Sequence, residues 1–209
     1  MARKKKAIDY INELCITKSE KRRAVGEKLK AQYERWIDTL SLEDFLKFNE
    51  TIMANKAEIG AAQFFGKFRA YAFEEYVYRL LKAKIHLEKP MEIFWAEKCL
   101  VWQENGEKYA MEFDILVGAR KGEFVEPTVV LDSKVELDSS RLKTALASFA
   151  LLKRWKPEAA CAIVYIKREL NDNLLKLARN WVDGIFQFSL QIDETASFLK
   201  FVAKTLRRN

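Results

Sequence analysis

The chain has 209 residues, of which 49% are hydrophobic and 32% charged, with only seven glycines and three prolines. This composition is typical of a globular protein with a sizeable core and excludes an intrinsically disordered chain. The formal charge of +7, from 37 basic and 30 acidic residues, favours a polyanionic partner.

Several classes of protein are excluded by what the sequence lacks. No apolar run is long enough for a membrane span, and the N-terminus lacks the apolar core of a signal peptide, so we expect an intracellular, cytoplasmic protein (host cytoplasm if viral) with no membrane partner. The three widely spaced cysteines read as core thiols, and the single histidine, His86, argues against His-rich catalytic sites. No phosphate-binding glycine loop is present, and no small-molecule substrate is expected. A catalytic site would therefore depend on carboxylates, lysine and metal.

The first part of the chain reads as helical. Helical character extends over residues 5–55, and Ser41 is a suitable N-cap. One helix is predicted to end near Leu40 and another to run over 42–54. A longer helix follows over about 57–87, which Gly60 or Gly66 bends.

Beyond Pro90 the pattern changes to the period of two that is typical of strands. Asn105-Gly106 between two such runs predicts a tight hairpin, and Gly118 and Gly122 predict a looser turn. The predicted strands of this section are 92–95, 99–102, 108–117 and 128–135.

The last third of the chain alternates helices and strands. Ser139-Ser140 is expected to cap a helix through about Trp155, and Pro157 precedes a buried strand over 161–167. A helix over 171–181, a strand over 185–190 and a helix over 193–206 complete the prediction. The sum is an α/β protein with a mixed central sheet flanked by helices.

Two short predicted strand segments combine acidic residues with a lysine. They are Glu112-Phe113-Asp114 and Asp132-Ser133-Lys134. Side chains two apart on a strand point to the same face, so Asp132 and Lys134 project together. Carboxylates suit a hard divalent cation, and a nearby lysine assists attack of water on a phosphodiester.

The apolar surroundings of these segments strengthen the metal reading. Asp132 follows Val129-Val130-Leu131, and Asp114 precedes Ile115-Leu116-Val117. Two acids in neighbouring buried strands repel each other unless a positive charge lies between them. A simple ion pair of Asp132 and Lys134 at a strand end is the structural alternative.

The order of these elements resembles the PD-(D/E)XK nuclease superfamily. The resemblance covers residues 60–167 and includes a helix containing Phe73-Glu74-Glu75-Tyr76, a hairpin, the two acidic segments, and then a helix and a strand. It implies a restriction-endonuclease-like α-β-β-β-α-β core, as in restriction endonucleases, archaeal Holliday junction resolvases, RecB-type nucleases and small archaeal-virus nucleases. Phe113 stands where the superfamily often has proline. The resemblance assigns residues 56–209 to the nuclease-like domain and leaves 1–55 as a helical N-terminal extension packed on the core.

The resemblance also implies a function and a set of site residues. Asp114 and Asp132 would bind Mg²⁺ or Mn²⁺, Lys134 would be the active-site lysine, Glu74 would join from the first core helix, and the main-chain carbonyl of Ser133 would add a ligand. The implied activity is metal-dependent DNA endonuclease, structure-specific or resolvase-like, on branched or duplex DNA, and the implied assembly is a homodimer. A sequence-specific restriction endonuclease and a non-catalytic DNA-binding protein with the same fold are the alternatives.

The acidic neighbours of these residues are ambiguous. Glu75 has Arg79 four residues later, the spacing of an exposed helical ion pair, whereas Glu74 shares its face with apolar residues, which favours Glu74 as the ligand. Glu112 and Glu136 are minor candidates, because each lies two residues from a predicted site residue on a strand.

Basic residues gather in two places, at the N-terminus and after the proposed site. Either cluster is a candidate surface for a phosphate backbone or simply a solvated helix face. The first comprises Arg3, Lys4, Lys5, Lys6, Lys18, Lys21, Arg22, Arg23, Lys28 and Lys30, and the second comprises Arg141, Lys143, Lys153, Arg154 and Lys156.

Overall fold

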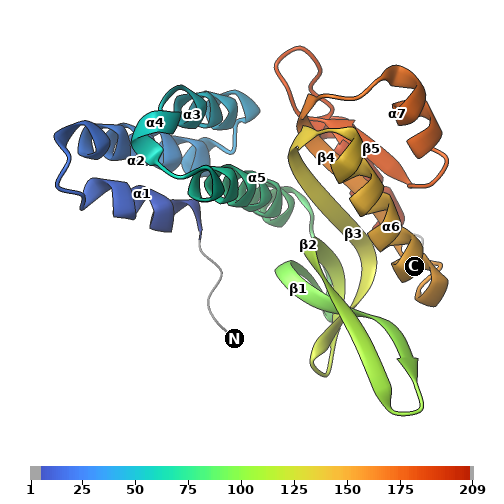
Figure 1. Cartoon of the computed structure of the whole chain (residues 1–209). Coiled ribbons are helices and arrows are strands. Elements are labelled where there is room, and N and C mark those ends of the chain that lie inside the picture. Colours follow the sequence, from blue (N-terminus) through green and yellow to red (C-terminus); the bar gives the residue numbers. More distant parts are fainter. Residues whose placement is uncertain (1–5, 208–209) are drawn as a thin grey trace. The chain divides into compact units, whose positions relative to one another are not determined.

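The computed structural model describes residues 6–207 (Figure 1). The chain divides into two compact units, Met1–Leu80 and Leu81–Asn209. The predicted boundary between residues 55 and 56 separates a helical extension from a nuclease-like domain, and it stays a prediction. No helix in the described range is long and apolar enough to span a membrane.

The first unit is helical, as the sequence predicts. It contains α1 (Ala7–Cys15), α2 (Glu20–Thr39), α3 (Leu42–Ala54), α4 (Lys56–Ile59) and most of α5 (Ala62–Lys84). The Ser41 cap is confirmed, since its side chain accepts a hydrogen bond from the Asp44 amide. The core of this first unit is aromatic, with the Phe45 and Tyr76 rings stacked at a centroid distance of 4.5 Å.

Two helix breaks in this unit differ from the prediction. The helical region that begins near residue 5 is interrupted between α1 and α2, where Ser19 caps α2 by accepting from the Arg22 amide. The helix expected over 57–87 is divided at Gly60, whose φ of 108° ends α4. A glycine adopts this backbone conformation without the steric cost that a side chain brings.

The second unit is built on a mixed five-stranded sheet in the order β1-β2-β3-β4-β5, which confirms the predicted fold class. β1 (Met91–Glu104), β2 (Glu107–Lys121) and β3 (Phe124–Leu137) form an antiparallel meander, and β4 (Ala160–Arg168) and β5 (Gly184–Gln187) continue in parallel. The β1–β2 turn is at Asn105-Gly106, as predicted, with both residues at positive φ.

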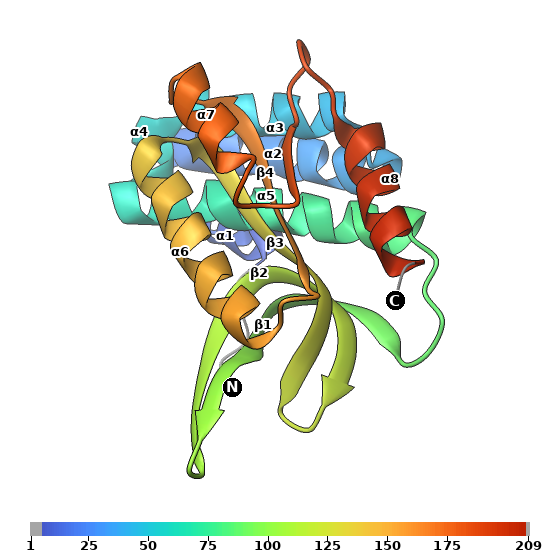
Figure 2. The same cartoon turned by 90° about the vertical axis from the view of Figure 1, so that its right-hand side faces the viewer.

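Helices cover both faces of this sheet (Figure 2). α6 (Ser139–Trp155) and α7 (Asp172–Ala178) share a hydrophobic cluster with Ile185 of β5. The next residue, Phe186, points the other way and meets Phe198 of α8 (Thr195–Leu206) at a centroid distance of 5.6 Å. The sheet is therefore the central layer of the unit.

Three details of this unit correct the sequence-based expectation. β1 is one strand rather than two, and Gly118 lies inside β2, so that the turn falls at Gly122 alone. The cap of α6 is Asp138 rather than Ser139-Ser140, because the Asp138 side chain accepts from the Arg141 amide at 2.8 Å.

Candidate functional site

Asp114 and Asp132 lie where β2 and β3 separate. The antiparallel ladder between the two strands ends at the pair Ile115 and Leu131, and the next residues along are Asp114 and Asp132. Beyond this point the two strands no longer pair. The Ser133 amide of β3 donates instead to the Asp114 side chain, with 2.7 Å between its nitrogen and Oδ2. This hydrogen bond holds the Asp114 carboxylate against the backbone of β3. The place where the two strands separate, next to Asp114 and Asp132, is called the fork below.

Lys134 joins the two acids. Its Nζ forms an ion pair with Asp132 Oδ1 and lies 3.6 Å from Asp114 Oδ2. The side chains of Asp114, Asp132 and Lys134 are 24%, 16% and 23% exposed, so the group is partly enclosed yet reachable from solvent. The structure therefore brings together three of the four predicted catalytic side chains.

Burial disfavours the ionised form of the Asp132 carboxyl. The pKa of its carboxyl is raised to about 6, first by desolvation and then by the charge of Asp114, and the Lys134 ammonium only partly opposes this shift. A second cation at the fork would favour the ionised form.

The donor set fits a hard divalent cation with few protein ligands. Asp132 Oδ1 is buried and, apart from its ion pair with Lys134, has no hydrogen-bond partner. Over residues 6–207 no group of three or more His, Cys, Asp or Glu side chains is arranged to hold a metal. Magnesium commonly takes one or two carboxylates and completes its shell with water and substrate oxygens, so Asp114 and Asp132 suffice for that ion.

Glu75 is a structural residue of the first unit. Its carboxylate is fully buried and accepts hydrogen bonds from the Ala7 amide, the Tyr33 hydroxyl and the Arg79 guanidinium. The expected pair with Arg79 is present, but on a buried rather than an exposed face. Burial of the Tyr33 hydroxyl raises its own pKa, and the charge of Glu75 raises it further.

Glu74 also lies in the first unit, on α5, and is 5% exposed. Its charge acts on Tyr10, whose pKa is raised to about 12, chiefly by burial and then by Tyr71 and nearby acids, among which Glu74 makes the smallest contribution. Glu74 as a metal ligand stays a proposal, as does the main-chain carbonyl of Ser133.

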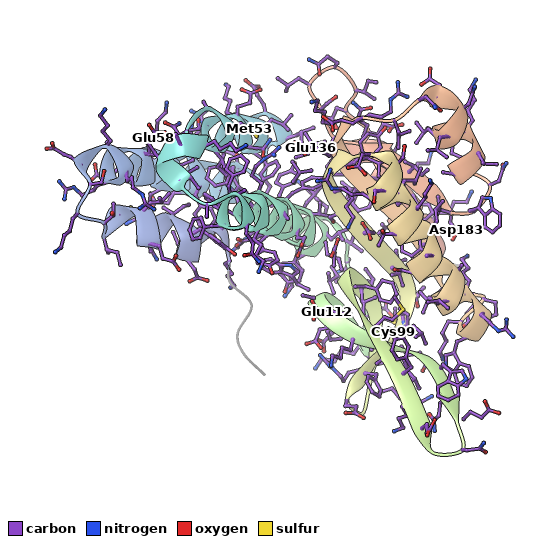
Figure 3. The ribbon with its side chains drawn as sticks, viewed as in Figure 1. Met53, Glu58, Cys99, Glu112, Glu136 and Asp183 are labelled. Atoms are coloured by element: carbon purple, nitrogen blue, oxygen red, sulfur yellow. The ribbon has the colours of Figure 1, made fainter. Side chains whose placement is uncertain are left out.

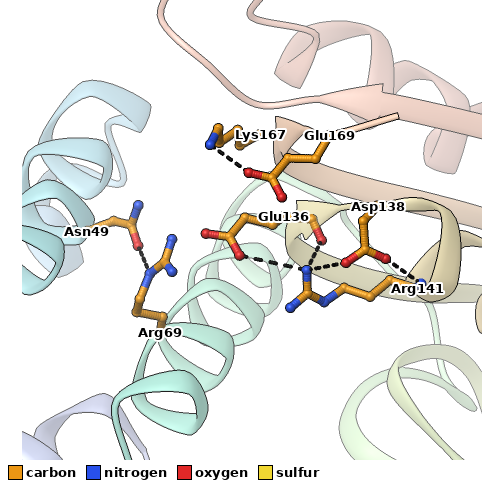
Figure 4. Close-up of polar contacts among 7 residues, drawn as sticks. All are labelled: Asn49, Arg69, Glu136, Asp138, Arg141, Lys167 and Glu169. Atoms are coloured by element: carbon orange, nitrogen blue, oxygen red, sulfur yellow. Dashed lines mark hydrogen bonds and ion pairs between the residues drawn. The ribbon is translucent and has the colours of Figure 1, made fainter. Parts of the chain in front are cut away.

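Glu112 and Glu136 lie apart from each other in the second unit (Figure 3). Glu112 is exposed on the β1–β2 hairpin, where it pairs with Lys98 in the strand register. Glu136, near the end of β3, has its Oε2 3.7 Å from Arg141 Nη1 (Figure 4). The surroundings of Glu136 are those of a residue that anchors the start of α6.

The basic cluster after the site is largely neutralised by the chain itself. Arg141 pairs with Asp138, Lys153 with Asp183 and Lys156 with Glu126. Lys143 and Arg154 are the exposed basic residues left on α6. Arg3, Lys4 and Lys5 of the N-terminal cluster lie outside the described residues.

The amide of Ser133 is the part of the site that sequence reasoning missed. The resemblance implied a ligand role for its carbonyl, which stays a proposal, and the structure adds that its N–H donates to Asp114 and orients it. No residue type signals a main-chain donor, and only the pairing of strands could have indicated it.

Comparisons with known proteins identify the fold. No family model matches the chain, and no curated protein matches it. Among solved structures, a chain of native BbvCI, described as an A2B2 tetramer at low resolution, has a TM-score of 0.54 and 13% sequence identity, with 96% of this chain and 88% of that chain covered. The fold is restriction-endonuclease-like.

Proposed function

We propose that this chain is a divalent-metal-dependent DNA endonuclease of the PD-(D/E)XK type that hydrolyses phosphodiester bonds. The observation that carries the proposal is the convergence of Asp114, Asp132 and Lys134 at the β2–β3 fork. Two acids and a lysine in this arrangement match the chemistry expected for phosphodiester cleavage, and the restriction-endonuclease-like fold supports it.

In this proposal Asp114 and Asp132 hold the cation, with Glu74 and the Ser133 carbonyl as further ligands. A bound Mg²⁺ or Mn²⁺ would supply Lewis acidity toward the phosphate and lower the pKa of water. The amide of Ser133 keeps Asp114 in place, so this carboxylate needs little reorganisation on binding.

Lys134 has two roles in the proposal. Before substrate binds, its ammonium offsets the repulsion between the two carboxylates. With DNA present, the same ammonium orients the attacking water or stabilises the negative charge that develops on the phosphate oxygens.

For the substrate we propose branched DNA, cleaved by a homodimer whose two sites address two strands. A sequence-specific restriction endonuclease is the second candidate, and the fold likeness to BbvCI over 96% of this chain favours it. A non-catalytic DNA-binding protein is the third, distinguished by salt-dependent binding without cleavage.

The test is cleavage of labelled duplex, single-stranded, flap and four-way-junction DNA, with Mg²⁺, Mn²⁺ or EDTA. We expect metal-dependent cleavage by the native chain and a loss of about a hundredfold or more in Asp132→Ala and Lys134→Ala. Glu112→Gln, a charge-removing change on the neighbouring hairpin, should retain activity. Full activity in either site variant contradicts the proposal.

Glu74 and Glu75 can be separated by paired variants. Glu74→Gln should reduce metal-dependent cleavage, if Glu74 acts as a ligand. Glu75→Gln should instead lower the free energy of unfolding by about 2–4 kcal/mol, because Arg79 loses its buried ionic partner. The opposite pattern would exchange their roles.

A further inference from the structure

A cavity of 690 Å³ lies in the second unit, away from the fork of β2 and β3. It is bounded by the end of α5, the segment that joins α5 to β1, Thr128 of β3 and the end of α8. Its volume falls in the range of pockets that hold small organic ligands.

Positive charge converges on this cavity from three separate segments. Lys84 comes from α5, His86 and Lys89 from the joining segment, and Arg207 from the end of α8. Glu88 is the one acidic residue among the described lining residues. Three permanent cations against one carboxylate make the hollow attractive to anions, because a concave surface focuses the field of its charges.

In the described part of the chain these charges have no acidic partner, in contrast to most of those on α6. Within residues 6–207, Lys84, Lys89, Arg207 and Glu88 form no ion pair. On α6, by comparison, Lys153 lies 2.8 Å from its acidic partner Asp183. The charge at the cavity is therefore available to a ligand.

The rest of the lining is apolar. Ile85, Leu87, Met91 and Leu206 contribute hydrocarbon surface, and Thr128 adds a hydroxyl. An inorganic anion would leave this surface unused, whereas a phosphate attached to a group with apolar faces, such as a nucleobase, would use both parts of the lining.

We infer that this cavity binds a nucleoside monophosphate group, either as a free nucleotide or at the end of a DNA strand. Lys84 and Arg207 take the phosphate, and the apolar lining takes the base. The inference does not depend on the proposed function, since none of the residues that carry it belongs to the fork. Thr128 and Asp132 are four residues apart on β3, a separation of about 13 Å along the strand.

His86 is the only histidine of the chain, and it gives a direct reporter. The probe is deoxyadenosine monophosphate, titrated into the full chain in EDTA while the single imidazole Cε1–Hε1 signal is followed by NMR and the heat by calorimetry. We expect a saturable shift of that signal, weaker binding of inorganic phosphate and no binding of deoxyadenosine. No shift at about 10 mM nucleotide, or equal binding of deoxyadenosine, overturns the inference.

Substitutions locate the site. Lys84→Ala and Arg207→Ala should each weaken nucleotide binding about tenfold, the usual effect of losing one charge-assisted hydrogen bond. Lys176→Ala removes an equal charge from an exposed position on α7 and should leave binding unchanged. Equal weakening in all three variants would indicate general electrostatic attraction and overturn the inference.

Asp132→Ala separates the two proposals. It should abolish cleavage and leave nucleotide binding intact, so that failure of one proposal is visible without failure of the other. An oligonucleotide with a 5′-phosphate that shifts the His86 signal, where its 5′-hydroxyl form does not, assigns the ligand to a strand end. A response to the mononucleotide alone assigns it to free nucleotide, and both results support the site.

Discussion

At the scale of single residues, ionisation of the buried Asp132 carboxyl lowers the stability of the folded chain. Its carboxyl follows an apolar strand segment and has a pKa of about 6, well above the ordinary value of 3.8. Between about pH 4 and pH 6 the folded chain keeps a proton that the unfolded chain has released, so stability falls as pH rises through this window. Above pH 6 the full cost of the buried anion is present.

Asp132→Asn should therefore stabilise the metal-free protein at neutral pH. A shift of this size corresponds to about 3 kcal/mol with the opposing effect of Lys134 already included, so we expect a gain of about 1–3 kcal/mol at pH 7. Urea denaturation in EDTA at pH 4.5 and pH 7 measures it.

The pH dependence serves as the control for this variant. Asp172→Asn, an exposed change on α7, should retain the fall in stability between the two pH values, and Asp132→Asn should lose it. An unchanged fall in Asp132→Asn would mean that another group is responsible.

At the scale of elements, the start of α6 depends on one side chain. Asp138 accepts from the Arg141 amide at 2.8 Å and pairs with the Arg141 guanidinium at 2.7 Å. Asp138→Ala should lower the free energy of unfolding by about 1 kcal/mol, as for other lost helix caps. Ser139→Ala, one residue later, should change it little. Equal losses in thermal denaturation would restore the cap that the sequence suggested.

The contact between β2 and β3 depends on a glycine. A Cβ at Gly118 would lie 2.1 Å from the Glu126 carbonyl oxygen, so Gly118→Ala must push the strands apart and should cost about 2–3 kcal/mol. Gly66, on α5, has open space around it, and Gly66→Ala should add about 0.5–1 kcal/mol through helix propensity. Chemical denaturation of both variants gives opposite signs if the contact is as described.

At the scale of the whole molecule, cation binding should be visible as stability. A cation that binds the folded chain at about a hundred times its dissociation constant adds about 2.7 kcal/mol, or roughly 5–10 °C in the melting temperature. We expect this rise on adding Mg²⁺ to the native chain and to Glu112→Gln, and none for Asp132→Ala. A rise of the same size in Asp132→Ala would place the cation elsewhere.

Much of this architecture could be predicted because its signals are local. Asn105-Gly106, the apolar strand around Asp132 and the Ser41 cap each act over a few residues, and the structure confirms them. The continuity of β1 could not be predicted, because Ala96 in its middle has a φ of 53° and is skipped in the register with β2, which resumes at Glu97. The burial of Glu75 depends on helices distant in sequence, so its spacing to Arg79 alone suggested an exposed pair.

The same distinction applies to the candidate site. Asp114, Asp132 and Lys134 meet because they occupy adjacent strands, which alternation and hairpin signals reveal. The cavity beside α8 brings together segments more than a hundred residues apart, and no periodicity connects them.

Because the Ser133 amide donates to Asp114, hydrogen–deuterium exchange at this amide reports on the state of the fork. The Ser133 amide proton is protected by its hydrogen bond to the Asp114 carboxylate. Val130, by contrast, lies in the part of β3 that is paired with both β2 and β4. A cation competing for the Asp114 oxygens should speed deuterium uptake at Ser133 and leave Val130 unchanged. Slower uptake at Ser133 with Mg²⁺ would mean that the carboxylate serves strand and ion together. One backbone position would then report occupancy of the fork without DNA or turnover.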